Sequence, residues 1–149
     1  MIIISGAQTG VDRAALDAAI ELGIPYSGSI PKDRRAEDGR VPDHYNLIEL
    51  TSYNYQDRTK VNVLDSDGTL IIAEGELSGG TKLTLNFCRQ YQKPALVIDP
   101  VNTMEFLSIE LIQAFIKDNN ITTLNVAGPR ESTWPEAYNE TKSLLKKVF

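Results

Sequence analysis

The chain has 149 residues, of which 42% are hydrophobic and 23% are charged, and its formal net charge is −5. This length and composition are typical of one compact domain, residues 1–149, and they exclude a disordered or fibrous chain. The acidic balance excludes a general electrostatic surface for nucleic acid, so an anionic ligand would have to be held by a few local cations and backbone amides.

Six short apolar runs predict strands, and five helical segments lie between them. We expect strands at residues 1–5, 24–28, 47–50, 69–73, 95–98 and 123–127, and helices at residues 10–22, 55–66, 81–92, 104–119 and 134–148. The runs are continuous rather than alternating, which is typical of parallel strands buried on both faces. This order predicts an α/β fold of Rossmann type, with a doubly wound, mainly parallel sheet of about six strands.

The first glycine turn follows the first expected strand. Its candidate ligand-binding residues are Gly6, Ala7, Gln8, Thr9 and Gly10. Thr9 and Asp12 have the spacing of a capping box, which predicts that the helix starts at Gly10 with its free amides facing a crevice. Arg13 lies in the first helical turn, where the helix dipole disfavours a cation unless an anion binds there. The alternative is an Arg13 side chain that bends into solvent.

Residues 29–46, with the sequence SIPKDRRAEDGRVPDHYN, interrupt the alternation of strands and helices. A stretch of this length without regular structure in a small domain is typical of a lid or a binding loop. Lys32 is therefore a further candidate for binding an anion. The only histidine, His44, lies in this loop, and we expect it at the surface.

The second glycine turn follows the expected strand at 69–73 and precedes a helix. Its candidate ligand-binding residues are Ser78, Gly79, Gly80, Thr81 and Lys82. Two adjacent glycines at the start of a helix form a site for phosphate or carboxylate, because the amides and the helix dipole both favour negative charge. Lys82, like Arg13, is a cation in a first helical turn, which is favourable only beside an anion.

The third turn follows the last expected strand. Its candidate ligand-binding residues are Gly128, Pro129, Arg130, Glu131 and Ser132. Thr133 and Glu136 again have the spacing of a capping box, which predicts the start of the last helix. Arg130 could clamp an oxyanion with two parallel hydrogen bonds. The alternative is a salt bridge to Glu131 or to another neighbour.

These three turns are expected to meet, because ligands of such folds bind beyond the carboxyl ends of the strands. Charge-assisted hydrogen bonds contribute roughly 1.5–3 kcal/mol each, whereas micromolar affinity needs about 8 kcal/mol. A flat or apolar part of the ligand would supply the rest. We expect it to contact one or two of the aromatic side chains Tyr26, Tyr45, Tyr53, Tyr55 and Trp134.

A metal site made of protein ligands is not expected, because the chain has one cysteine, one histidine and no cluster of ligands. Cys88 allows no internal disulfide, and with the lack of a charged-then-apolar leader it predicts a cytoplasmic protein. We expect its side chain in the core. No apolar stretch approaches the roughly 20 residues that span a bilayer, so no membrane partner is expected.

Six stretches of the chain together resemble a known family. They are SGAQTGVDRAALDAAIELGIPYSG, PKDRRAEDG, YQDRTKVNVLDSDGTLII, LSGGTKLT, KPALVID and NVAGPRES. In this order they resemble the molybdenum-cofactor carrier proteins. That family is a circularly permuted, YpsA-like branch of the Rossmann-like superfamily that includes the LOG phosphoribohydrolases and the lysine-decarboxylase-like proteins. The resemblance implies a LOG-like topology in which the last strand and helix correspond to the first ones of a LOG domain.

The resemblance also implies roles for some residues. In LOG enzymes a Gly-Gly-x-Gly-Thr loop binds nucleotide phosphate, and an arginine with a glutamate cleaves the bond between base and phosphoribose. Residues 79–81 correspond to this loop, and Arg58 corresponds to the arginine. Thr84 stands where the enzymes carry the glutamate, and a threonine cannot act as acid or base at neutral pH. The remaining carboxylates for catalysis with Arg58 are Glu74, Glu76 and Asp67.

The leading hypothesis is therefore a binding protein for a phosphorylated, ring-containing small molecule rather than an enzyme. The ligand would be a nucleotide or a molybdopterin-type cofactor. One alternative is a LOG-like hydrolase of N-glycosidic or phosphate bonds, and another is a nucleotide-sensing signalling protein. Relatives with this sheet commonly pair through helices, so the resemblance implies a homo-oligomer, either a dimer or a tetramer.

Overall fold

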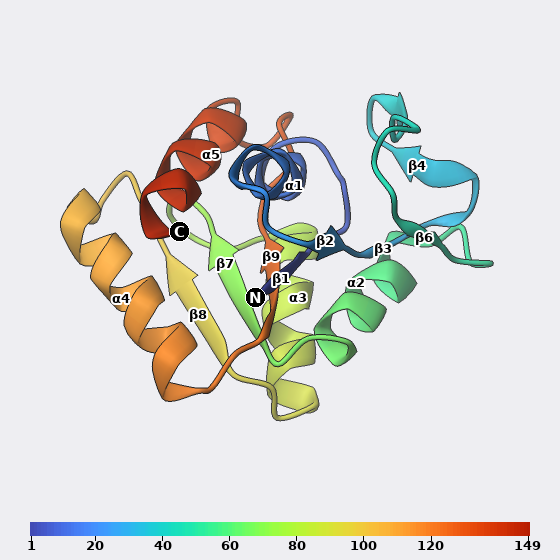
Figure 1. The fold of residues 1–149 in the computed structure, drawn as a ribbon. Coiled ribbons are helices and arrows are strands. Elements are labelled where there is room, and N and C mark those ends of the chain that lie inside the picture. The colour runs from blue at the N-terminus through green and yellow to red at the C-terminus, as the bar shows by residue number, and fades with distance from the viewer.

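A five-stranded parallel sheet lies at the centre of the structure, a computed structural model that describes all residues from 1 to 149 (Figure 1). The strands are β1 (Ile2–Ile4), β2 (Tyr26–Ser27), β7 (Gly68–Ile72), β8 (Ala95–Ile98) and β9 (Thr123–Ala127). Their order across the sheet is β2-β1-β9-β7-β8, and every neighbouring pair is parallel. β7 is buried along its whole length, as its continuous apolar run predicts.

Helices cover both faces of this sheet. They are α1 (Val11–Leu22), α2 (Tyr55–Leu64), α3 (Gly79–Gln90), α4 (Glu105–Asp118) and α5 (Ala137–Val148). α5 packs against α1 and α4, whereas α2 packs against α3. Figure 1 shows α1, α4 and α5 on one face of the sheet and α2 and α3 on the other. The predicted doubly wound α/β sheet of Rossmann type is therefore confirmed.

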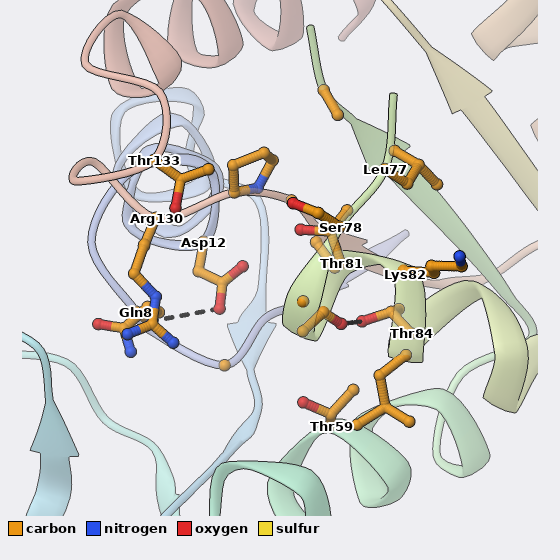
Figure 2. Close-up of a pocket in the computed structure, with 18 of the residues that line it drawn as sticks. Gln8, Asp12, Thr59, Leu77, Ser78, Thr81, Lys82, Thr84, Arg130 and Thr133 are labelled. Carbon is orange, nitrogen blue, oxygen red and sulfur yellow. Dashed lines mark hydrogen bonds between the residues drawn. The ribbon is translucent and has the colours of Figure 1, made fainter. Parts of the chain in front are cut away.

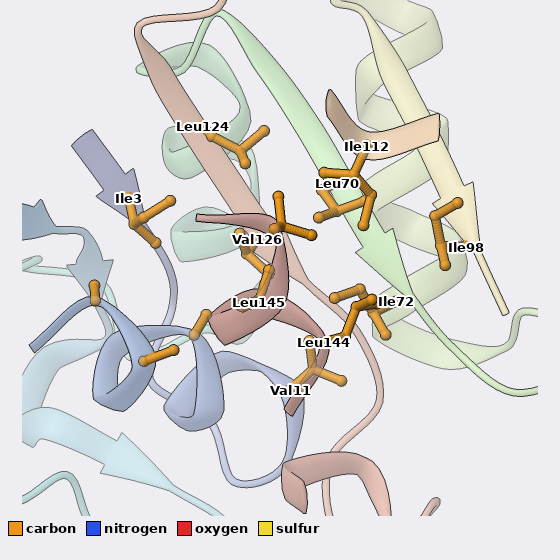
Figure 3. Packing of buried hydrophobic residues seen from close by; sticks show 14 of the residues in the cluster. Ile3, Val11, Leu70, Ile72, Ile98, Ile112, Leu124, Val126, Leu144 and Leu145 are labelled. Atoms are coloured by element: carbon orange, nitrogen blue, oxygen red, sulfur yellow. The ribbon is translucent and has the colours of Figure 1, made fainter. Parts of the chain in front are cut away.

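The main core lies between the sheet and the layer formed by α1 and α5 (Figure 3). Leu70 and Ile72 of β7, Leu124 and Val126 of β9 and Leu145 of α5 are essentially fully buried there. Burial of one such side chain contributes about 1.5–3 kcal/mol relative to exposure. This layer holds β7 and β9 in a register that pairs Leu70 with Val126.

The two ends of the chain meet in the sheet. β1 pairs in parallel with β9, with Ile3 beside Leu124, and α1 packs along α5. Joining Phe149 to Met1 would make β9, α5, β1 and α1 consecutive elements, which is the arrangement that the permuted LOG-like topology predicts.

The expected strand at residues 47–50 does not join the central sheet. β6 (Ile48–Glu49) pairs with β3 (Ser29–Ile30) in a separate two-stranded parallel sheet. The chain leaves β2 at Gly28, where φ is +145° and a Cβ atom would lie 2.0 Å from the Ser5 carbonyl oxygen. Because only glycine fits this turn, the chain is directed away from the central sheet. The central sheet therefore has five strands, close to the number of about six that we expected.

Residues 29–46 contain more regular structure than the sequence indicated. After a 3₁₀ turn, η1 (Lys32–Arg34), the strands β4 (Arg35–Ala36) and β5 (Gly39–Arg40) form an antiparallel hairpin whose tip is Glu37 and Asp38. This β4–β5 hairpin rests on a small second core. The core consists of Ala7, Leu16, Ile30, Ala36, Val41 and Tyr45.

The last helix begins later than expected, at Ala137 rather than near residue 134. The N–H groups of Thr133 and Trp134 both donate to the Arg130 carbonyl oxygen, at 3.0 Å each, and form a turn. Neither Thr133 nor Glu136 caps the helix with its side chain. The predicted capping box at this position is therefore wrong.

Two single residues lie where we expected them. Cys88 is 1% exposed and packs in the core, and His44 is exposed beside the Tyr45 ring. Large apolar side chains remain exposed at the start and along one side of α4, among them Phe106 and Leu111. No helix of the structure combines the length and the apolar character that crossing a membrane requires.

Gly128, directly after β9, is tightly enclosed, because a Cβ atom there would lie 2.2 Å from the Ile72 carbonyl oxygen and 2.6 Å from Val11 Cγ2. We expect Gly128→Ala to lower the free energy of unfolding by about 1–3 kcal/mol or more, measured by urea denaturation, since the backbone neighbour cannot yield cheaply. Gly80→Ala is the control, because a Cβ atom there meets nothing within 4 Å. Equal stability of the two variants would contradict the prediction.

Candidate functional site

A cavity of about 920 Å³ opens at the carboxyl ends of β1, β7 and β9 (Figure 2). Its walls come from the β1–α1 turn with the start of α1, from α2, from the β7–α3 turn with the first half of α3, and from the β9–α5 loop. The three turns that we expected to meet therefore all contribute to one cavity. Its size is that of an ordinary small-molecule site.

Most of the predicted site residues line this cavity. They are Gly6, Gln8, Ser78, Gly79, Gly80, Thr81, Lys82, Gly128, Pro129, Arg130 and Ser132, together with the catalytic candidates Arg58, Glu74 and Glu76. The other predicted residues are not in its walls: these are Ala7, Thr9, Gly10, Arg13, Lys32 and Glu131. Only one side of the first turn therefore lines the cavity. The other side faces the β4–β5 hairpin.

The start of α3 keeps its backbone amides free. The N–H groups of Gly79, Gly80 and Thr81 donate no hydrogen bond to another protein group, and the first turn contains no acidic side chain. A Cβ atom at either glycine would meet nothing within 4 Å, so the backbone is open to the cavity. Free amides and the helix dipole together favour a negative group at this position.

The start of α1 differs, because several of its amides are bonded within the protein. The helix begins at Val11, whose N–H donates to a carbonyl of the β9–α5 loop at 3.3 Å, and the Gln8 N–H donates to Asp12 Oδ2, also at 3.3 Å. Thr9 does not cap the helix, since its hydroxyl donates to Glu37. The predicted capping box at this turn is therefore wrong, whereas the N–H groups of Gly10 and Asp12 donate to no protein group.

The β4–β5 hairpin supplies carboxylates at two positions where we expected a bound anion. Asp38 pairs with Arg13 through both terminal guanidinium nitrogens, with Nη2 2.8 Å from Oδ1. Glu37 accepts the Ser132 N–H at 3.2 Å and the Ser132 hydroxyl at 2.6 Å. Burial raises the pKa of Glu37, but hydrogen bonds from Ser132 and Thr9 outweigh this effect and hold the pKa below its ordinary value. Arg13 therefore has its compensating negative charge from the chain itself.

Asp12 and Arg58 form a buried pair in the wall of the cavity. Asp12 Oδ2 lies 3.9 Å from Arg58 Nη1, and Arg58 also donates to the Gly6 carbonyl oxygen. Burial raises the pKa of Asp12 to about 6, and burial lowers the pKa of Arg58. Buried charged groups with such shifts, placed in a cleft, are typical of functional sites.

From the sequence, we expected Asp12 only to cap the helix. Its place in the cavity wall was missed. The pattern of α1 contained a signal for it. Asp12 shares a helix face with Ala15 and Ala19, three and seven residues later, and both alanines are buried. An acidic residue on the buried face of a helix that follows a glycine turn indicates a charged group at a ligand site.

Three guanidinium groups surround the ring of Tyr55. The central carbon of Arg35 lies 4.3 Å from the ring centroid, and those of Arg58 and Arg130 lie 5.4 Å from it. Such cation–π contacts contribute about 0.5–2 kcal/mol each, depending on how far the cation is removed from water. Of the five aromatic side chains predicted as ligand platforms, Tyr55 and Trp134 line the cavity.

The residues for base-releasing hydrolysis are incomplete. Thr84 lines the cavity at the position of the LOG glutamate, and its hydroxyl donates to the Gly80 carbonyl oxygen at 2.9 Å. Glu74 and Glu76 line the cavity with exposed side chains. Asp67, in contrast, precedes β7 and accepts backbone amides that precede β9, so it lies at the opposite end of the strands and is excluded as a catalytic candidate. No group of three or more His, Cys, Asp or Glu side chains is placed to hold a metal ion.

Comparison with known proteins agrees with the resemblance that the sequence motifs indicated. Residues 3–149 match the family described as the circularly permutated YpsA SLOG family. A crystal structure of a protein from Syntrophus aciditrophicus SB, named "Putative molybdenum carrier protein", is 51% identical, with 99% of this chain and 93% of that chain covered and a TM-score of 0.96. No curated protein matches the chain.

We expect the Asp12 carboxyl to reduce stability as the pH rises through its folded pKa. Because burial raises this pKa from 3.8 to about 6, the folded protein holds a proton that the unfolded chain has already lost between these values, and the free energy of unfolding decreases with pH in that window. A shift of about two units corresponds to roughly 3 kcal/mol. In urea denaturation, the free energy of unfolding of Asp12→Asn should therefore rise relative to that of the wild type as the pH increases from 4 to 7. The change in this difference should reach up to about 3 kcal/mol.

Asp38→Asn is the control, and its difference from wild type should stay nearly constant from pH 4 to pH 7 and change in the opposite direction below the unfolded pKa of 3.8. The Arg13 hydrogen bond lowers the pKa of Asp38, so this carboxylate stabilises the fold above its unfolded pKa and loses the effect as the pH falls. A difference for Asp12→Asn that stays constant with pH would contradict the assignment of a buried, perturbed carboxyl.

Proposed function

Because the chain belongs to the circularly permutated YpsA SLOG family, we propose that it binds a phosphorylated, ring-containing small molecule in the cavity described above. The ligand is a nucleotide or a molybdopterin-type cofactor that is carried as cargo. The free amides at the start of α3 carry this proposal. The 51% identical structure is named "Putative molybdenum carrier protein", which supports a carrier role.

The start of α3 is suited to a phosphate group. The N–H groups of residues 79–81 have no acceptor in the protein, and the open backbone at Gly79 and Gly80 lets a phosphate approach them closely. Lys82 lines the cavity in the same helical turn and has no ion-pair partner. A bound phosphate would neutralise this cation and reverse its unfavourable interaction with the helix dipole.

A ring on the ligand accounts for the remaining affinity. Hydrogen bonds to a charged group contribute roughly 1.5–3 kcal/mol each, and a micromolar complex needs about 8 kcal/mol. Tyr55 and Trp134 are the aromatic side chains in the cavity wall, and Tyr55 is the less buried of the two. We therefore assign the ring of the ligand to the Tyr55 side of the cavity.

Binding without catalysis is favoured by the threonine at the position of the LOG glutamate. Thr84 donates its hydroxyl proton to the helix backbone and carries no titratable group. Hydrolysis of an N-glycosidic or phosphate bond is the second candidate function, because Arg58, Glu74 and Glu76 line the same cavity. We expect no release of free base when the protein is incubated with nucleoside monophosphates and the products are separated by chromatography.

We also propose that the chain forms a homo-oligomer in the cytoplasm. The exposed Phe106, Leu107 and Leu111 of α4 support an interface between copies, because side chains of this size are commonly covered by a partner when they lie together. The buried free thiol of Cys88 supports a reducing compartment. Light scattering of the purified protein should give the mass of a dimer or tetramer, and a monomer mass would contradict the oligomer.

Gly80→Asp should abolish binding of ring phosphates. The new carboxylate would stand among the free amides of α3 and exclude a phosphate by occupying them and by repulsion. Calorimetry with adenosine and guanosine 5′-monophosphate and with a phosphorylated pterin measures the effect. Gly80→Ala is the matched comparison, because it adds a Cβ atom that meets no protein atom within 4 Å and adds no charge, so its affinity should fall far less than that of Gly80→Asp.

Two outcomes would overturn the proposed function. One is the absence of binding of all three compounds to the wild-type protein. The other is an unchanged affinity of Gly80→Asp, which would mean that the start of α3 does not hold the phosphate.

A further inference from the structure

Gln8 carries a buried amide group whose donor has no partner. The residue is 5% exposed and lines the cavity, and Nε2 makes no hydrogen bond. Its Oε1 accepts the N–H groups of Thr9 at 3.1 Å and Glu37 at 2.9 Å. These two bonds determine which end of the amide is oxygen, so Nε2 is a donor without an acceptor. A buried donor without an acceptor lowers stability by about 1–3 kcal/mol. A hydrogen bond from Nε2 to an oxygen atom of a ligand would restore this free energy.

Arg58 lies in the same wall and uses few of its donors. A guanidinium group has five N–H bonds, but Arg58 makes a hydrogen bond only to the Gly6 carbonyl oxygen. The nearest carboxylate oxygen, Asp12 Oδ2, is 3.9 Å away, which is beyond hydrogen-bond distance. The residue is nevertheless 7% exposed. A buried guanidinium with most donors unused is poorly compensated by the protein alone.

The Arg130 side chain has no hydrogen-bond partner in the protein. Its ion pair is with Glu37, at 3.9 Å, and not with Glu131. The Glu37 carboxylate already accepts hydrogen bonds from Ser132 and Thr9. The central guanidinium carbons of Arg58 and Arg130 each lie 5.4 Å from the Tyr55 ring centroid, so both groups lie at the same part of the cavity wall.

These donors lie on the opposite side of the cavity from the start of α3. Figure 2 shows Gln8, Asp12 and Arg130 on one side, with Ser78 and Thr81 on the other. Among the charged residues of this side that line the cavity, the two guanidinium groups of Arg58 and Arg130 outnumber the one carboxyl of Asp12. The side of the cavity that includes Gln8 therefore has an excess of positive charge and of unused donors.

We propose that Gln8 Nε2, Arg58 and Arg130 form a second oxyanion site, so that the ligand carries two separate acidic groups. One is the phosphate at the start of α3, and the other is a phosphate or carboxylate that these three side chains bind. This inference rests on the proposed function and narrows the ligand class to doubly anionic ring compounds. A ring between the two groups lies beside Tyr55.

The test compares three nucleotides that differ in their phosphates: adenosine 5′-monophosphate, adenosine 5′-diphosphate and adenosine 3′,5′-bisphosphate. Calorimetry should show that at least one of the two doubly phosphorylated compounds binds the wild-type protein about tenfold to hundredfold more tightly than the monophosphate, the gain expected for charge-assisted hydrogen bonds. The measured quantity is the ratio of the two affinities for each protein variant.

Two substitutions should remove this gain. Gln8→Glu keeps the acceptor oxygen for Thr9 and Glu37 and replaces the Nε2 donor by a negatively charged oxygen, so the ratio should fall to one or below. Arg130→Gln removes one guanidinium group. The Arg130 side chain is 38% exposed, so this variant should fold even if the buried Gln8→Glu variant does not. Lys32→Gln removes an exposed cation outside the cavity and should keep the wild-type ratio.

The outcomes separate this inference from the proposed function. If the monophosphate binds and Gly80→Asp abolishes its binding, but the second phosphate adds nothing, the second oxyanion site is wrong and the first remains. A gain that survives both Arg130→Gln and a folded Gln8→Glu also overturns the second site. If none of the three nucleotides binds, the proposed function falls, and this inference falls with it.

Discussion

The parallel pairing of β9 with both β1 and β7 is the constraint on which the site depends. Parallel strands end at the same edge of a sheet, so the turns that follow these three strands are brought to one place. Gly128 allows the turn after β9 to pass within contact distance of β7 and α1, since a side chain there would overlap the Ile72 carbonyl oxygen and Val11. The cavity is therefore a consequence of strand order and of close backbone packing.

The protein satisfies some of the anion positions at this edge with its own carboxylates. The β4–β5 hairpin brings Asp38 to Arg13 and Glu37 to the β9–α5 loop, and Asp12 accepts an amide of the first turn. The start of α3 keeps three consecutive free amides and has no acidic side chain in its first turn. This distribution of charges directs a ligand phosphate to α3, because the other positions already hold carboxylates of the protein.

The wall opposite α3 has a cost in stability that a ligand can offset. A carboxyl whose pKa is raised by burial and a guanidinium with most donors unused both reduce the free energy of unfolding. Such groups persist at sites where binding restores the missing interactions. In our proposals the phosphate at α3 supplies general affinity, and the pairing of a second oxyanion with Gln8, Arg58 and Arg130 supplies selectivity among ring phosphates.

The sequence by itself determined the fold class, the helices and the five strands of the central sheet close to their bounds, and the three glycine turns at one edge, because apolar runs and glycines act through local geometry. The family followed from the linked motifs. The tertiary structure alone decided which amides stay free and which cations are neutralised. The Arg13–Asp38 and Glu37–Ser132 contacts join residues 25 and 95 positions apart, and they exist because the turn at Gly28 directs the chain away from the sheet and lets the β4–β5 hairpin fold back onto the first and third turns. No local pattern encodes that placement, so Arg13 was assigned to a ligand.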